Sequence, residues 1–201
     1  MSPSIVVFDL GNVLVRWDRR LLYRTLIDDP AELDRFLGDV LTMEENAALD
    51  RGTPLAEMTA DLARRHPADA ALIDAFRTRW IETIGEVIHE SVGALEELLA
   101  RGVRCYALSN WGADTFEQVA DRFEWLSWFD GLVISGREGM VKPEREIFDL
   151  LCRRYDFVPT EALFIDDSTA NIATARQLGF ATMLFVDPAD LRPELERHGL
   201  L

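Results

Sequence analysis

The 201-residue sequence is poor in cysteine, lysine and long apolar segments, and each scarcity narrows the class of protein. The two cysteines, Cys105 and Cys152, are too few for a disulfide scaffold and lack the spacing of a metal site, which favours a reducing, cytoplasmic location. No apolar run approaches the ~18 residues that a membrane helix needs. The first residues also lack the basic and apolar regions of a signal peptide.

Positive charge is scarce as well. The net charge of -15 argues against nucleic acids and anionic membranes as partners, because these would be repelled. A small anionic substrate stays compatible, since one site can be locally positive. Every cationic side chain is an arginine except Lys142, which points to a position that requires a compact ammonium group. The sequence gives no indication of the oligomeric state.

The sequence does contain enough apolar residues, 48%, for a full core, and they follow two different patterns. Residues 4–8 predict a buried strand, and from about residue 91 apolar strands alternate with amphipathic helices. This alternation predicts an α/β fold with a Rossmann-like, doubly wound parallel sheet. Between them, residues 18–85 show helical patterns and no strand. We therefore expect a core of residues 1–15 and 88–201, with a helical domain of residues 16–87 inserted after the first strand.

The expected elements can be placed by their turn and cap residues. In the inserted domain, helices are predicted at residues 19–27, 31–41, 54–65 and 68–84. In the second part of the core, helices are predicted at 91–102, 113–123, 144–155, 169–178 and from about 188, alternating with strands at 103–108, 131–135, 162–165 and 181–186.

Polar residues follow four of the predicted strands. Because ligands of open parallel sheets bind beyond the carboxyl ends of the strands, these residues are candidates for one shared site. Each alone has an ordinary role as a turn, cap or surface residue, but together they are unlike a chance arrangement. The candidates are Asp9, Ser109, Asn110, Lys142, Asp166 and Asp167.

The chemistry of this set is specific. Three carboxylates that lie close together repel one another and favour a bound proton or divalent cation. Oxygen ligands alone favour Mg²⁺ as the cofactor. The ammonium of Lys142 and the hydroxyl of Ser109 can hold phosphate oxygens, and Asn110 is a further candidate for binding substrate. A carboxylate such as Asp9 can attack a phosphoryl group to form an aspartyl-phosphate.

Four segments at these positions resemble the motifs of the haloacid dehalogenase-like hydrolase superfamily. They read VVFDLGNVL, ALSN, GMVKPEREIF and LFIDDSTANI in chain order. The resemblance covers the whole chain, and the inserted helical domain resembles the family's cap of the first type. The FDLGNV form resembles a branch that includes bacterial sugar-phosphate phosphatases.

The resemblance implies a role for each candidate. It implies a nucleophilic Asp9, a phosphate contact from Ser109 and a Lys142 that steadies both nucleophile and phosphate. It also implies Mg²⁺ held by the carboxylates of Asp9, Asp166 and Asp167 and by the backbone carbonyl of Gly11. We further expect Asn171 to orient the acid pair and Asn12 to form the turn after the first strand, because asparagine tolerates left-handed backbone. Two tryptophans, Trp17 and Trp111, are candidates for the pocket wall.

One residue departs from the family pattern. Most phosphatases of the family carry a second aspartate two residues after the nucleophile, where it serves as general acid and base, and here that position is Gly11. Such a group typically contributes ~10²–10⁴ in rate. The interpretation that we favour is a phosphatase for a small phosphorylated metabolite, for example a sugar phosphate, in which water or a cap residue such as Asp18 replaces the acid. The alternatives are a dehalogenase-like hydrolase, whose halide leaving group needs no proton, and a weakly active phosphate-binding protein.

Overall fold

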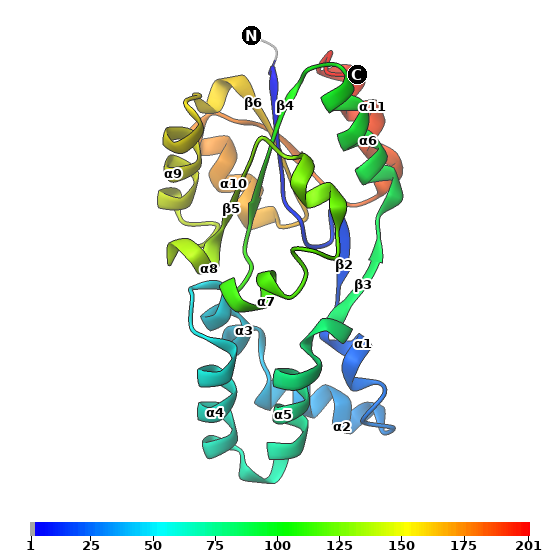
Figure 1. The fold of residues 1–201 in the computed structure, drawn as a ribbon, viewed down its shortest axis with the longest axis vertical. Coiled ribbons are helices and arrows are strands. Elements are labelled where there is room, and N and C mark those ends of the chain that lie inside the picture. Colours follow the sequence, from blue (N-terminus) through cyan, green and yellow to red (C-terminus); the bar gives the residue numbers. More distant parts are fainter. Residues whose placement is uncertain (1–2) are drawn as a thin grey trace.

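The computed structural model describes residues 3–201 and contains a five-stranded sheet (Figure 1). All neighbouring strands are parallel, and β1 lies at the centre. In sheet order the strands are β5 (Gly131–Ile134), β4 (Arg104–Ser109), β1 (Ile5–Phe8), β6 (Ala162–Asp166) and β7 (Ala181–Leu184). This order confirms the predicted α/β fold with a parallel, Rossmann-like sheet.

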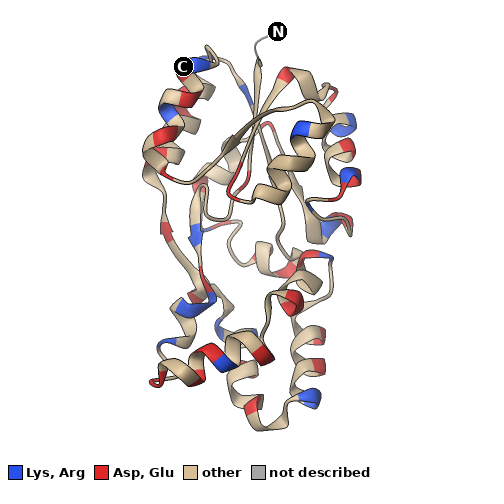
Figure 2. Ribbon diagram, turned by 180° about the vertical axis from the view of Figure 1, so that it is seen from behind, with Lys and Arg blue, Asp and Glu red and all other residues tan. Residues whose placement is uncertain are grey.

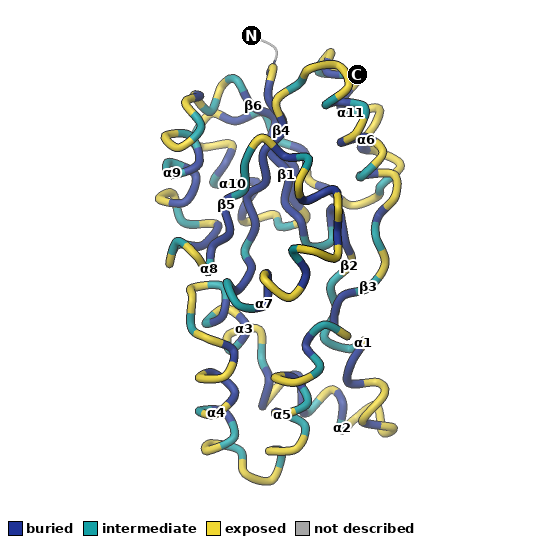
Figure 3. Tube along the Cα trace, viewed as in Figure 1, coloured by how far each residue is buried: buried dark blue, intermediate teal, exposed yellow. Residues whose placement is uncertain are grey.

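Helices cover both faces of the sheet. One face carries α6 (His89–Ala100) and α11 (Leu191–Arg197), and the other carries α9 (Arg145–Tyr155) and α10 (Thr169–Leu178). A strand that is covered on both faces must be apolar at every position, because successive side chains point to opposite faces. All four residues of β1 are buried accordingly, and Figure 3 shows the strands as the buried centre of this part of the molecule.

A second lobe, made of helices, lies beyond the carboxyl ends of the strands (Figure 1). Its helices are α1 (Arg19–Tyr23), α2 (Pro30–Arg35), the π-helical segment Phe36–Val40, α3 (Met43–Asp50), α4 (Leu55–Arg65) and α5 (Ala70–Arg79). Buried side chains of this lobe, such as Leu22 and Phe76, belong to one apolar cluster with side chains of the sheet. We call this part of the molecule the helical lobe; the domain boundaries at residues 16 and 87 stay a prediction.

A two-stranded antiparallel ribbon joins the sheet to the helical lobe. Its strands are β2 (Val15–Trp17) and β3 (Ile84–Val87), and they pair although about 70 residues separate them in the chain. The prediction of no strand within residues 18–85 is wrong at its end, because β3 begins at Ile84. A four-residue strand whose partner is distant leaves no local pattern, so its pairing is decided by the tertiary fold.

The helices differ from the prediction in several places. The helix expected over residues 19–27 ends at Tyr23, and α5 covers residues 70–79 of the predicted 68–84. The helix expected over residues 113–123 is only α7 (Ala113–Glu117), and α8 (Ser135–Glu138) lies where a loop was expected. The helix α3 was not predicted. Its sequence signal is an N-cap threonine with glutamate three residues later, and the hydroxyl of Thr42 accepts a hydrogen bond from the backbone N–H of Glu45 at 3.2 Å.

The charged residues are spread over the outer helices. Figure 2 shows acidic and basic positions interspersed along the helices of both lobes. Within residues 3–201, none of the helices combines the length and apolarity that a bilayer-spanning segment requires.

Candidate active site

The first element of the site is the end of β1. Asp9 follows the last residue of this strand, and its backbone N–H donates to the carbonyl of Ile165 in β6 at 2.9 Å. The backbone N–H of Leu10 donates to Oδ1 of Asp9 at 2.7 Å and fixes the carboxylate. The chain then turns at Asn12, whose φ of 57° is left-handed and confirms the expected turn. The strand therefore ends by presenting a carboxylate at the edge of the sheet.

The ammonium group of Lys142 joins two of the carboxylates. Its Nζ lies 3.0 Å from Oδ2 of Asp9 and 2.6 Å from Oδ2 of Asp166, and its side chain is fully buried. The side chain of Asn110 fixes the Lys142 backbone from both sides. Its Oδ1 accepts from the Lys142 N–H at 2.8 Å, and its Nδ2 donates to the Lys142 carbonyl at 2.9 Å. Asn110 thus positions the ammonium, while its contact with substrate stays a prediction.

Several donors hold the carboxylate of Asp166. The side-chain amide of Asn171 donates to both of its oxygens, at 2.9 and 3.1 Å, and the backbone N–H of Ser168 donates to Oδ1 at 2.8 Å. With Lys142, this gives a completely buried carboxylate four hydrogen-bonding contacts, as a charge at such a position requires. The expectation that Asn171 orients the acid pair is met for Asp166.

Three carboxylates converge at this point. One oxygen from each of Asp9, Asp166 and Asp167 lies within 4.8 Å of the others. Three carboxylates and the single ammonium of Lys142 leave two negative charges unbalanced. One divalent cation would neutralise them. All donor atoms are oxygens, the ligand type that Mg²⁺ prefers. The residues therefore fit a magnesium ion.

Burial governs the protonation of this cluster. It raises the pKa of Asp9 to about 7, although the charge of Lys142 opposes the shift; the charges of Asp166 and Asp167 add to it. Burial and the charge of Asp166 also raise the pKa of Asp167. Burial alone would lower the pKa of Lys142. The charges of Asp166 and Asp9 outweigh this effect, so the pKa is raised. A divalent cation bound to these carboxylates would favour their ionised forms and oppose the upward shifts in pKa.

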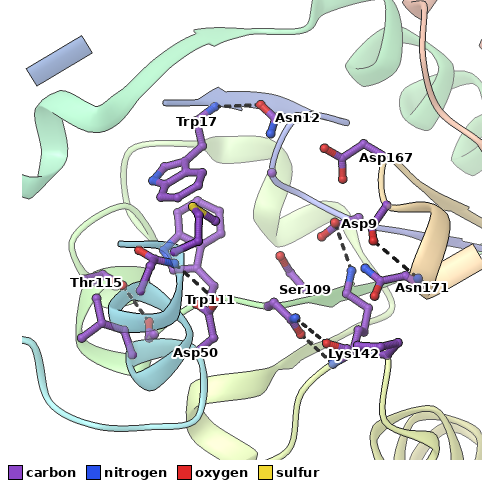
Figure 4. Close-up of a pocket in the computed structure, with 18 of the residues that line it drawn as sticks. Asp9, Asn12, Trp17, Asp50, Ser109, Trp111, Thr115, Lys142, Asp167 and Asn171 are labelled. Carbon is purple, nitrogen blue, oxygen red and sulfur yellow. Dashed lines mark hydrogen bonds and ion pairs between the residues drawn. The ribbon is translucent and has the colours of Figure 1, made fainter. Parts of the chain in front are cut away.

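A cavity of about 350 Å³ lies between the acid cluster and the helical lobe (Figure 4). Six of the seven predicted site residues line it, and the seventh, Asp166, lies buried behind Lys142. Opposite them, the wall is rich in apolar and aromatic side chains, with the amide of Asn46 and the carboxyl of Asp50 among them. The apolar part consists of Trp17, Met43, Leu49, Trp80 and Trp111.

The structure corrects the set of pocket residues in two ways. Trp17 and Trp111 lie in the wall as expected, but Asp18 is not among the lining residues. Its carboxylate instead accepts the backbone N–H of Arg20 at 2.8 Å and caps α1. The sequence interpretation missed Asp50 and Trp80, which come from the helical lobe. The capping signal of α3 could have indicated a helix that ends at Asp50, but nothing local indicates that this helix end faces Asp9.

Known proteins resemble this chain over most of its length. A family model described as haloacid dehalogenase-like hydrolase matches residues 3–179. D-ribitol-5-phosphate phosphatase of Bacteroides thetaiotaomicron is 27% identical over an alignment of 208 residues including gaps. The alignment covers 94% of this chain and 95% of the relative. Sesquiterpene phosphatase astK of Aspergillus oryzae is 26% identical over 185 residues, covering 90% of this chain and 89% of the relative.

A solved structure shows the same fold. The family enzyme bt-2542 of Bacteroides thetaiotaomicron, in complex with magnesium and inorganic phosphate, aligns with a TM-score of 0.69 at 23% identity. The alignment covers 94% of this chain and 98% of that chain. The chain therefore shares its fold with an enzyme that holds magnesium and phosphate, and its relatives include phosphatases.

Proposed function

This chain belongs to the haloacid dehalogenase-like hydrolase family, and we propose that it is a magnesium-dependent phosphomonoesterase for a small phosphorylated metabolite. The observation that carries the proposal is the cluster of Asp9, Asp166 and Asp167, in which Lys142 balances one of three negative charges beside a cavity. Phosphatases among the relatives support the same reaction class.

In the proposed mechanism, Asp9 is the nucleophile. The N–H of Leu10 holds Oδ1 of its carboxylate, and Lys142 holds Oδ2. Either oxygen can attack a phosphoryl group placed in the cavity, giving an aspartyl-phosphate that water then cleaves. Lys142 offsets the negative charge that nucleophile and phosphate bring together, and the hydroxyl of Ser109, at the end of β4, contacts a phosphate oxygen.

The proposed cation site consists of the carboxylates of Asp9, Asp166 and Asp167 and the backbone carbonyl of Gly11. When bound, Mg²⁺ neutralises phosphate charge and orients a phosphoryl oxygen. The residues behind this site are fixed already, because Asn171 and Ser168 hold Asp166 through three hydrogen bonds. The carboxylate geometry is therefore set before substrate arrives.

The far wall of the cavity supports a small organic leaving group. Trp17, Trp80 and Trp111 offer flat apolar surfaces, while Asn46 and Asp50 offer hydrogen-bonding groups. A wall of this kind suits a compact metabolite with both apolar faces and hydroxyl groups, such as a sugar phosphate. At about 350 Å³, the cavity lies near the lower end of the range for ligand pockets.

A second candidate function is dehalogenation, in which Asp9 displaces halide from carbon. The glycine at position 11 favours it, because halide leaves without a proton. The excess of carboxylates at the site speaks against it, since displacement at carbon gives no use for a cation-binding acid pair. A third possibility is a phosphate-binding protein with little turnover.

One experiment separates these functions. Hydrolysis of p-nitrophenyl phosphate is measured with Mg²⁺, with a chelator, and for Asp9→Asn. The phosphatase proposal requires turnover that needs Mg²⁺ and is lost in the variant. If no turnover is seen, activity on 2-haloacids without metal would establish the second function, and stoichiometric binding of inorganic phosphate alone would establish the third.

A further inference from the structure

The proposed reaction lacks a proton donor at its usual place. Attacking and leaving oxygens lie roughly in line across the phosphorus atom, so the leaving oxygen faces away from Asp9. Gly11 has no side chain to protonate it. A donor should therefore come from the opposite wall of the cavity, which the helical lobe supplies.

Four ionisable side chains line the cavity: Asp9, Asp50, Lys142 and Asp167. Asp9 is assigned to attack, Lys142 is engaged by Asp9 and Asp166, and Asp167 belongs to the proposed cation site. Asp50 is left without a catalytic role. It is the last residue of α3, and in Figure 4 it lies across the pocket from Asp9, with Ser109 between them in the view.

The surroundings of Asp50 favour a protonated carboxyl group. Burial raises its pKa to about 7, and both the charge of Lys142 and the amide of Asn46 oppose the shift. The contact with Asn46 is long, 3.4 Å from Nδ2 to Oδ2, so it stabilises the carboxylate only weakly. Arg51, the next residue in the chain, is engaged by Glu144 at 2.6 Å. A carboxyl of this kind can give and take a proton near neutral pH.

Contacts between the lobes hold the end of α3 in place. The Arg51–Glu144 ion pair ties the residue after Asp50 to the start of α9. The backbone N–H of Leu55 donates to Oδ2 of Asp114 in α7 at 2.7 Å. Gly52 packs so closely that an added Cβ would lie 2.9 Å from the carbonyl oxygen of Gly136. These contacts fix Asp50 relative to the sheet.

We infer that Asp50 is the general acid and base of this enzyme and replaces the family's usual aspartate, absent at Gly11. In the first step, an Asp9 oxygen bonds to phosphorus while the bond from phosphorus to the leaving oxygen breaks. The electron pair of that bond takes the proton of the Asp50 carboxyl, which releases an alcohol. In the second step, a water oxygen attacks phosphorus and its proton goes to the Asp50 carboxylate. The Asp9–phosphate bond then breaks, which frees phosphate and restores both residues.

This inference rests on the proposed phosphatase function, and its test must separate the two. The kcat/KM of wild type and Asp50→Asn is measured with Mg²⁺ on p-nitrophenyl phosphate, phenyl phosphate and glycerol phosphate. These leaving groups need a proton increasingly in that order. We expect Asp50→Asn to lose only a few-fold on p-nitrophenyl phosphate and ~10²–10³-fold on glycerol phosphate.

The matched control is Asp18→Asn, which changes the other aspartate considered for this role. Asp18 caps α1 outside the cavity, so this variant should keep the wild-type order of the three substrates. A uniform loss in Asp50→Asn, or no loss, overturns the role of Asp50 while leaving the phosphatase function intact. Wild type without turnover on any of the three substrates overturns both. Thermal melting of each variant checks that it folds.

Discussion

Asp9 and Asp50 face one cavity from opposite lobes, and burial raises the pKa of both to about 7. Their neighbours differ. Asp9 lies beside two more carboxylates and within 3.0 Å of the Lys142 ammonium, whereas the contact recorded for the Asp50 carboxyl is the amide of Asn46. A divalent cation in the acid cluster would favour the ionised form of Asp9, whereas Asp50 lies outside that cluster. Equal shifts in pKa therefore support different roles, because the neighbouring charges differ.

The two carboxyls also differ in how firmly they are placed. Asp9 continues the central strand of the sheet and is held by the N–H of Leu10 and by Lys142. Asp50 ends a helix of the other lobe and depends on contacts between the lobes, such as Arg51–Glu144, whose side chains are both partly exposed. Nucleophile and cation site are thus built into the core, while the proposed acid depends on how the lobes are docked.

The largest effect is expected for Asp9→Asn, which replaces the nucleophile by an amide of the same shape. Magnesium-dependent hydrolysis of p-nitrophenyl phosphate should fall by at least ~10⁴-fold, because no other carboxylate can form the phosphoryl intermediate. Asp50→Asn should lose far less on this substrate. A larger loss in Asp50→Asn than in Asp9→Asn would reverse the assignment of the two residues.

The next effect concerns stability. Asp166→Asn removes the closer partner of the buried Lys142 ammonium and leaves it with Asp9 alone. Breaking a buried pair typically costs ~3–5 kcal/mol in the free energy of unfolding, and urea denaturation would measure the loss. Asp50→Asn is the matched control for this loss of stability, because it leaves no buried cation without its ion-pair partner. We expect it to be neutral or slightly stabilising above pH 7, because it removes the cost of ionising a buried carboxyl.

The pH dependence of magnesium binding should separate the two carboxyls next. Without a divalent cation, the folded protein holds the Asp9 proton more tightly than the unfolded chain does, so this group's favourable contribution to stability is lost as the pH rises from 3.8 to about 7. Magnesium competes with that proton. Its affinity, measured by calorimetry, should weaken about tenfold per pH unit below 7 and level off above it. Asp50→Asn should leave this profile unchanged, and a shifted profile would place Asp50 within the cation site.

The smallest effect is expected for a rescue. An added Cβ at Gly11 meets no atom within 4 Å, so the first side-chain atom of Gly11→Asp causes no clash. This substitution restores an acid at the position usual in the family. Introduced into Asp50→Asn, it should recover about tenfold in kcat/KM on glycerol phosphate, a fraction of the typical contribution of an acid–base group. Wild type carrying Gly11→Asp is the control. Equal changes in both backgrounds would show that the two acids do not substitute for each other.

Much of the core could be predicted from the sequence because its signals are local. An apolar run ending in Asp9, and further strands ending near Ser109 and Asp166, indicate a parallel sheet with polar residues at one edge. The scarcity of lysine pointed to Lys142. The physical reason is that its buried ammonium lies between Asp9 and Asp166, a compact contact that an arginine side chain does not reproduce.

The sequence by itself thus determined the sheet, the family of the chain and the residues of the acid cluster, because strand periodicity and strand ends are properties of short segments. Only the tertiary structure decided what faces that cluster. Three features depend on residues far apart in the chain: the pairing of β2 with β3, the packing of α3 against glycines of the core, and the position of Asp50 in the cavity. Asp18 caps α1 through the N–H of Arg20, a contact within its own segment, whereas only the docking of the helical lobe brings Asp50 to the cavity that Asp9 also lines.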